Sequence, residues 1–119
     1  MTWRVMALAT VVALTLSRIA LAACKQDVQA LYYMCKKTGT TEYWICAGFV
    51  GGVADLMGLF SVGPRDREPA LKAFSMCASP SHGAMVQAFI NWAETHPEQW
   101  DQPQVNRVVQ ALRSQWPCP

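Results

Sequence analysis

At the centre of the chain lies the apolar segment EYWICAGFVGGVADLMGLF, residues 42–60. Its apolar side chains recur at the spacing of an α-helix, and one side is formed by Tyr43, Cys46, Val50, Val53 and Met57. Small residues crowd the rest of the surface. A glycine inside a helix costs up to about 1 kcal/mol relative to alanine, so the close approach of another helix backbone is the simplest explanation. The segment therefore predicts a long central helix.

Three residues of this helix are expected to have structural roles: Gly48, Gly52 and Asp55. The two glycines have the spacing at which membrane helices pair. Asp55 argues for a buried helix of a soluble protein instead, since a carboxylate is costly in lipid. If it is buried, this carboxylate needs a hydrogen-bond partner, and a catalytic role is its alternative. No segment after the N-terminal leader is expected to span a membrane.

The remaining helices are predicted from the same periodicity and from start and stop signals. Gly39 ends the first of them, and the pair His96-Pro97 ends the third. The expected ranges are 26–37, 79–95 and 101–115, with a short helical turn at 69–76. No alternating strand pattern occurs. The fold class is therefore all-α, a small domain of four to five helices arranged as two αα-hairpins.

The N-terminus has the features of a secretory signal peptide, residues 1–22: Arg4, a short apolar run and a final Ala-x-Ala. The run is shorter than the roughly 20 residues that span a bilayer. Arg18 favours ordinary cleavage, which leaves 23–119 as the mature domain. Residues 21–24 also resemble a lipobox, in which Cys24 would be lipidated. We expect a periplasmic protein, lipid-anchored only in that second case.

The mature domain is close to neutral. Removing Arg4 and Arg18 leaves eight of the ten Lys and Arg residues against eight Asp and Glu residues. No basic patch suggests nucleic acid, and no charge run suggests a membrane surface. The partner is therefore expected to be a protein or a small molecule.

Five cysteines occur in this small exported chain, where disulfides are the usual outcome. Cys24 is the odd one, at the cleavage point. Spacing alone allows three pairings of the other four, but the helices favour Cys35–Cys46 and Cys77–Cys118, because each pair joins the ends of one antiparallel hairpin. The second bridge closes a loop worth about 3–4 kcal/mol in the chain-entropy model.

Catalytic and metal-binding patterns are weak. The chain has no Cys-x-x-Cys and no suggestion of a nucleophile beside a base. Cys77 and His82 are the nearest approach to a zinc pair, and a disulfide explains that cysteine better. We therefore expect no enzyme activity, no metal and no cofactor.

A family resemblance rests on several of these residues. The run CAGFVGGVAD, residues 46–55, resembles the Cys-x-Gly-Tyr-Ile-x-Gly-Val-x-Asp stretch of the Tai/Rap immunity proteins, which protect bacteria against type VI secretion amidase effectors. Further matches are Cys35, Cys77, Gly83-Ala84-Met85, His96-Pro97-Glu98 and Trp116-Pro117-Cys118. The resemblance extends over residues 27–118. The segment 78–82 departs from it, being shorter than the family's.

The resemblance implies a periplasmic helical protein, often a homodimer, that binds a peptidoglycan amidase and occludes its active site. It assigns the inhibitory segment to the link between the last two long helices, residues 95–102. Composition supports this segment, because prolines restrain it and an aromatic anchor lies within it. The predicted partner-binding residues are His96, Glu98, Gln99 and Trp100.

Two alternatives stay open. The alternative to an interface anchor at Trp100 is a residue packed in the core. If Trp100 is an anchor, its replacement by alanine weakens binding by about 2 kcal/mol or more and leaves the fold intact.

The alternative to an immunity protein is a small periplasmic stress chaperone or another exported binding protein.

Overall fold

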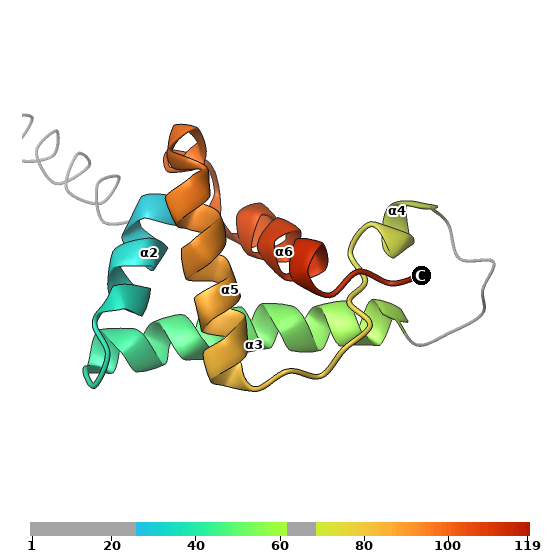
Figure 1. The fold of residues 1–119 in the computed structure, drawn as a ribbon, viewed down its shortest axis with the longest axis horizontal. Coiled ribbons are helices and arrows are strands. Elements are labelled where there is room, and N and C mark those ends of the chain that lie inside the picture. The colour runs from blue at the N-terminus through green and yellow to red at the C-terminus, as the bar shows by residue number, and fades with distance from the viewer. Residues whose placement is uncertain (1–25, 62–68) are drawn as a thin grey trace, which may run out of the picture.

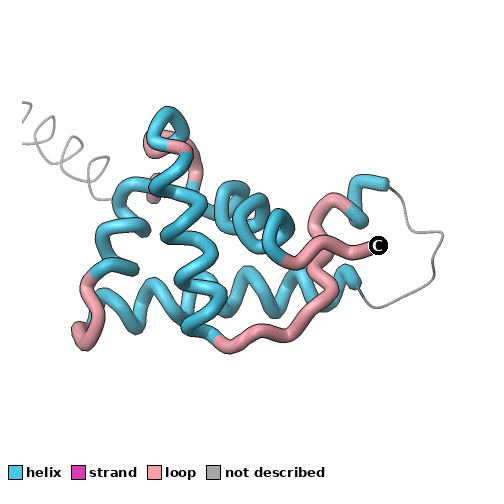
Figure 2. The backbone as a smooth tube through the Cα atoms, viewed as in Figure 1, coloured by secondary structure: helices cyan, strands magenta, loops and turns pink. Residues whose placement is uncertain are grey.

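The computed structural model describes residues 26–61 and 69–119 of the chain. The predicted signal peptide, its cleavage point and Cys24 lie outside these residues. The described parts consist of helices and loops, as Figure 2 shows, with one isolated β-bridge. The elements are α2 (Val28–Lys36), α3 (Thr41–Ser61), α4 (Pro69–Lys72), α5 (His82–Thr95), the 3-10 turn η1 (Pro97–Gln99) and α6 (Gln104–Gln115). The all-α prediction is confirmed.

The long central helix is α3, which lies along one edge of the molecule in Figure 1. The helices α2, α5 and α6 all pack against it. Their contact surface on α3 consists of Cys46, Ala47, Val50, Gly51, Ala54 and Met57. Contrary to expectation, α3 is long and apolar enough to cross a membrane by length and composition alone, with 33% of its 18-residue window buried.

Two disulfides close the two hairpins, and both predicted pairings are confirmed. Cys35–Cys46 joins α2 to α3 with its Cα atoms 5.2 Å apart. Cys77–Cys118 joins the segment before α5 to the end of α6 with its Cα atoms 4.8 Å apart. Gly39 adopts φ 79° in the α2–α3 turn, a conformation that favours glycine. The turn can therefore bring the first cysteine pair together.

The core is apolar and receives side chains from α2, α3, α5 and α6. Its largest fully buried members are Phe89, Met57, Leu112, Val28, Val50 and Val108. Each comes from the apolar stripe of its own helix, so burial follows the period of 3.6 residues. This shared core fixes the position of the α5–α6 link.

The start of α2 is tied to that link by backbone hydrogen bonds. The N–H of Val28 donates to the carbonyl of Gln102 at 3.0 Å, and the N–H of Gln29 donates to the carbonyl of Trp100 at 3.0 Å. The carboxylate of Asp27 accepts from the N–H of Ala30 at 2.9 Å. These bonds satisfy N–H groups that a helix start otherwise leaves without partners. The α2 start and the α5–α6 link therefore form one rigid unit.

Three expectations about α3 are corrected. A Cβ atom at Gly48 or Gly52 would meet nothing within 4 Å, so no helix among the described residues approaches them closely. The glycine with a close neighbour is Gly51, where a Cβ would lie 2.6 Å from Cδ2 of His82. Asp55 is exposed rather than buried. The reason is the rotation of α3 about its own axis, which places Gly48, Gly52 and Asp55 on the face opposite the core.

The smaller elements also differ from the prediction. The expected turn at 69–76 is shorter, since α4 covers only Pro69–Lys72. The turn η1 was not predicted, because three residues are too few to produce a periodic pattern. It lies inside the predicted inhibitory segment and shapes it.

Candidate functional site

The four predicted partner-binding residues lie together at the corner between α5 and α6, which projects at one end of α5 in Figure 1. We call residues 95–102 the corner segment. Consecutive backbone hydrogen bonds hold it: the N–H of Gln99 donates to the carbonyl of His96 at 3.0 Å, and the N–H of Gln102 donates to the carbonyl of Gln99 at 3.1 Å. Its shape is therefore fixed before any partner arrives, which lowers the entropy lost on binding.

His96 is directed toward its own helix rather than outward. Its ring stacks on the ring of Trp92, with centroids 4.5 Å apart and planes 11° apart. Its Nδ1 lies 2.8 Å from the carbonyl oxygen of Trp92 and 3.0 Å from the hydroxyl of Thr95. The half-buried ring thus closes the end of α5, and the face that stacks on Trp92 is not available to a partner.

Trp100 is half-buried. It is therefore neither a fully exposed interface anchor nor a fully buried core residue, the two roles that the sequence left open. Its indole N–H donates to the carbonyl of Ala93 at 2.8 Å. Its ring lies 5.0 Å from the ring of Tyr32 and 6.0 Å from the ring of Tyr33, measured between centroids. Trp100 therefore holds the corner segment against α2 and presents only part of its surface to solvent.

The outer surface of the corner segment is acidic. Glu98 and Asp101 are both exposed. The carboxamide of Gln99 donates to the Glu98 carboxylate at 3.5 Å, and that of Gln102 donates to the Asp101 carboxylate at 3.1 Å. The sequence analysis selected Glu98 and Gln99 but not Asp101, although its place in the same short link was the available signal. The corner thus offers two carboxylates on a rigid support.

An exposed polar cluster on α2 and α5 lies beside this corner. The hydroxyl of Tyr32 donates to Oε1 of Glu94 at 2.8 Å, and Nζ of Lys36 lies 3.0 Å from the same oxygen. The hydrogen bond from Tyr32, followed by the bond and charge of Lys36, lowers the pKa of Glu94. Glu94 in turn raises the pKa values of Tyr32 and Lys36.

Tyr33 extends this surface, since its side chain is 51% exposed next to Trp100. Sequence reasoning did not select it. Aromatic side chains at the edge of a rigid patch are frequent anchors of protein interfaces. The candidate surface therefore combines acidic groups of the corner with an aromatic group of α2.

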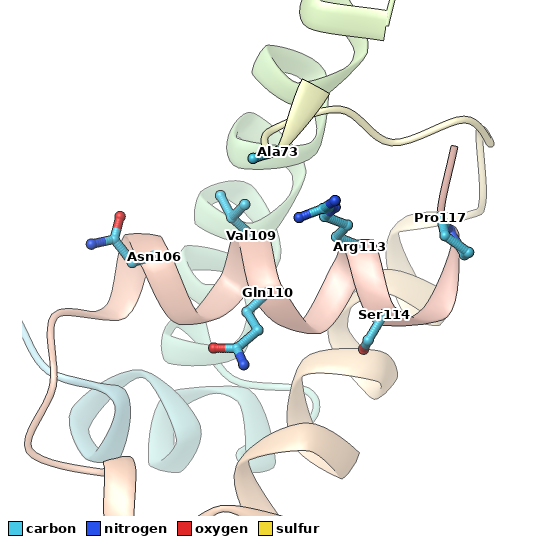
Figure 3. A pocket seen from close by; sticks show the side chains of 7 residues that line it. All are labelled: Ala73, Asn106, Val109, Gln110, Arg113, Ser114 and Pro117. Carbon is cyan, nitrogen blue, oxygen red and sulfur yellow. The ribbon is translucent and has the colours of Figure 1, made fainter. Parts of the chain in front are cut away.

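A second candidate is a hollow of about 360 Å³ between α6 and the segment that follows α4, shown in Figure 3. Its lining consists of Ala73, Asn106, Val109, Gln110, Arg113, Ser114 and Pro117. Arg113 is the one charged residue of this lining, and the Ser114 hydroxyl donates to the carbonyl of Ala111 at 2.8 Å. The lining offers no nucleophile beside a base. Among residues 26–61 and 69–119, no three His, Cys, Asp or Glu residues are grouped so that they could hold a metal ion.

Comparison with known proteins gives one match. The family model described as Rap1a immunity proteins matches residues 27–118. This range includes both hairpins, both disulfides and the corner segment. No curated protein and no solved structure matches the chain.

Proposed function

The chain belongs to the Rap1a immunity proteins, and from this premise we propose that it protects its cell by binding a type VI secretion effector that is a peptidoglycan amidase. Binding places the corner segment over the amidase active site and excludes the peptidoglycan substrate. The chain acts by occlusion and contributes no chemistry of its own. The proposed compartment is the periplasm, where peptidoglycan is exposed to an incoming amidase.

The observation that carries the proposal is the pre-ordered acidic corner within a chain that matches this family along most of its length. A segment that blocks a groove must project and must keep its shape when the partner approaches. The corner segment meets both needs, since it projects at the end of α5 and its backbone is bonded internally and to α2.

The chemistry of this surface suggests what it meets. Glu98 and Asp101 can accept hydrogen bonds from cationic or N–H groups, which the catalytic histidine of a Cys-His amidase would provide. Tyr33 and the exposed part of Trp100 supply apolar contact beside them. We therefore assign Glu98 and Asp101 to direct contact with the amidase. The other three residues, His96, Gln99 and Trp100, both contact the amidase and hold the corner segment in position.

The resemblance to the family also supports a homodimer. The exposed apolar side chains of α3 offer a surface for it, and the helix α3 itself lies at the other side of the ribbon from the corner segment in Figure 1. In such an assembly, each copy could bind one amidase.

The test begins with a pull-down from the periplasm, using the full chain as bait. We expect one dominant partner, a peptidoglycan amidase, whose activity on purified cell wall falls when the chain is added. The double variant Glu98→Lys, Asp101→Lys should weaken inhibition by about a hundredfold, or some 2.7 kcal/mol. The matched control is Gln87→Lys, Gln115→Lys, two exposed positions outside the corner.

Three results would count against the proposal. Recovery of many loosely bound unfolded chains, with no amidase among them, would favour the chaperone alternative. Cleavage of cell wall by the chain itself would contradict a purely occluding role. Normal inhibition by the corner variant would place the binding surface elsewhere on the molecule.

A further inference from the structure

The hollow beside α6 takes no part in the proposed inhibition of an amidase. Its volume of about 360 Å³ lies within the range of small-molecule sites, roughly 300–1,000 Å³. Most of its lining comes from α6 and the residues just after it, at a spacing of three and four residues that forms one stripe: Asn106, Val109, Gln110, Arg113, Ser114 and Pro117. In Figure 3, Val109 and Arg113 extend from α6 to the side on which Ala73 lies. The hollow is therefore bounded by two separate parts of the chain.

The lining combines small apolar groups with hydrogen-bond donors. Ala73, Val109 and Pro117 supply methyl and methylene surface. Nη1 of Arg107, outside the lining, donates to Oε1 of Gln110 at 3.0 Å. Because that oxygen is occupied, the Nε2 group of Gln110 remains to donate to a ligand. A ligand that fits both features has a small apolar body and several acceptor oxygens.

The charge around the hollow is positive. Arg113 makes no hydrogen bond or ion pair with another residue of 26–61 or 69–119. The residues that line the hollow include no Asp or Glu, and α6 contains Arg107 and Arg113 but no acidic residue. Lys72 directly precedes Ala73 and adds a third cation nearby. This arrangement favours an anionic ligand.

We propose that the hollow binds the peptide stem of peptidoglycan by its C-terminal carboxylate. The planar guanidinium of Arg113 suits a carboxylate, which it can hold through two parallel hydrogen bonds. The free amide group of Gln110 donates to a carbonyl oxygen of the peptide. The methyl group of the terminal alanine packs on Val109 and Ala73.

The chemistry of the stem peptide favours it over other anions. It carries several carboxylates on a short chain rich in alanine, so it can use both the positive charge and the apolar surface of the hollow. Inorganic phosphate would use the charge alone. The cell wall lies in the periplasm, so the source of the ligand rests on the compartment assigned in the proposed function. Binding of this kind would hold the chain beside the substrate of the amidase.

The test uses the purified full chain and a soluble disaccharide-tetrapeptide released from peptidoglycan. Nuclear magnetic resonance titration should shift the amide signals of Ala73, Val109 and Arg113. The same compound with its C-terminal carboxylate converted to an amide should bind about tenfold more weakly or worse, because it cannot pair with the guanidinium. Added salt should also weaken binding, since Arg113 is exposed.

Two variants separate charge from shape. Arg113→Gln should weaken binding about tenfold or more, whereas Lys37→Gln, which removes the same charge at the α2–α3 turn, should not. Ala73→Trp should abolish binding by filling the hollow. Its matched control is Ala78→Trp, an exposed position of the same segment outside the lining. Circular dichroism checks that each variant keeps the native helix content.

Several outcomes would overturn the inference. Equal binding of the amidated compound would show that the carboxylate is not recognised. Competition by acetate as strong as that of the stem peptide would make the hollow a general anion site. Unchanged binding in Arg113→Gln and Ala73→Trp would place the peptide elsewhere. Because the titration contains no amidase, a failure to bind the peptide together with normal inhibition overturns this inference and leaves the proposed function standing.

Discussion

The indole N–H of Trp100 donates a 2.8 Å hydrogen bond to the backbone carbonyl of Ala93, joining the corner segment to the last turn of α5. The same ring packs between Tyr32 and Tyr33 of α2. One side chain therefore connects three elements. The sequence could identify Trp100 as the notable residue of the link but could not show that it faces inward.

Trp100→Ala should destabilise the fold by about 2 kcal/mol, because it removes a half-buried aromatic ring and a hydrogen bond. Trp100→Phe keeps the aromatic contacts and should cost only about 1 kcal/mol, for the lost indole hydrogen bond, because the Ala93 carbonyl still accepts from the N–H of His96 at 3.2 Å. Urea unfolding followed by circular dichroism measures both. Trp100 is therefore packed too closely for Trp100→Ala to leave the fold intact, as the anchor interpretation had predicted.

Inhibition of the amidase by the two Trp100 variants shows whether Trp100 positions the corner segment or contacts the amidase directly. If Trp100 mainly holds the corner segment, Trp100→Phe should inhibit the amidase nearly as well as the native chain does. A large loss of inhibition in Trp100→Phe with normal stability would instead make the indole a direct contact.

The helices and disulfides could be predicted from sequence because each rests on a local, periodic signal. Cys35 and Cys46 are linked by a short turn with a glycine, so their proximity followed from the order of the helices. The rotational position of α3 could not be predicted in the same way. Its apolar residues surround nearly the whole helix, so pattern alone did not show whether Gly48 and Gly52 or Gly51 faces the core.

Asp27→Ala should destabilise the protein by about 1–2 kcal/mol, because the Asp27 carboxylate caps the N-terminus of α2 through the N–H of Ala30. Asp27→Asn retains a side-chain oxygen at the same place and should lose much less. Thermal melts of both variants at neutral pH give the comparison. Equal losses in the two variants would show that charge, rather than capping, is what matters at this position.

Gly51 and His82 should be energetically coupled, since a Cβ at Gly51 would lie 2.6 Å from the imidazole ring. Gly51→Ala gains helix propensity of about 1 kcal/mol but displaces that ring. In a His82→Ala background the obstruction is gone, so the same change should be more favourable by about 1 kcal/mol. A double-mutant cycle from urea unfolding measures the difference. Additive effects would mean that the ring moves aside freely.

The pair Tyr32–Glu94 predicts a pH dependence with a definite sign. The pKa of Glu94 is lowered in the folded chain, first by the hydrogen bond from Tyr32 and then by Lys36. Its stabilising contribution is therefore present above the unfolded pKa of about 4.3 and is lost as the pH falls through the lower folded value. Glu94→Gln should be less stable than the native chain at pH 7, and the two should converge below about pH 4.

High pH should act through the partners of Glu94. The pKa values of Lys36 and Tyr32 are raised, chiefly by Glu94, so their contribution is complete below their unfolded values of about 10 and is lost as the pH rises through the folded ones. Because the cluster is exposed, salt should reduce both effects. Melting curves at low and high ionic strength provide this check. A pH profile of Glu94→Gln parallel to that of the native chain would contradict the assignment.

The candidate site was only partly predictable, for a physical reason. Glu98 lies in a short link with prolines nearby, and that local composition marked it as exposed. Tyr33 was missed because its exposure depends on how α2 packs against the corner segment, which is a tertiary property. Asp101 was missed although its signal was local.

The two disulfides should differ in their resistance to reduction. Cys35 and Cys46 are both 0% exposed, whereas Cys77 is exposed and Cys118 is half-buried. A thiolate reductant must reach a sulfur atom, so Cys77–Cys118 should open first. In the chain-entropy model its loss costs about 4 kcal/mol, against about 3 kcal/mol for the shorter loop of Cys35–Cys46. Opening of Cys77–Cys118 should therefore destabilise the whole domain and so expose Cys35–Cys46 to the reductant.

Timed reduction with dithiothreitol, alkylation and peptide mapping would follow this order. We expect alkylated Cys77 and Cys118 to appear well before alkylated Cys35 and Cys46. The bridge Cys77–Cys118 lies at the end of the α5–α6 hairpin opposite the corner segment, so a briefly reduced sample should still inhibit the amidase while melting at a lower temperature. Early alkylation of Cys35 or Cys46 would show that the α2–α3 hairpin opens locally. Loss of inhibition together with the first bridge would show that the corner segment depends on the far end of its hairpin.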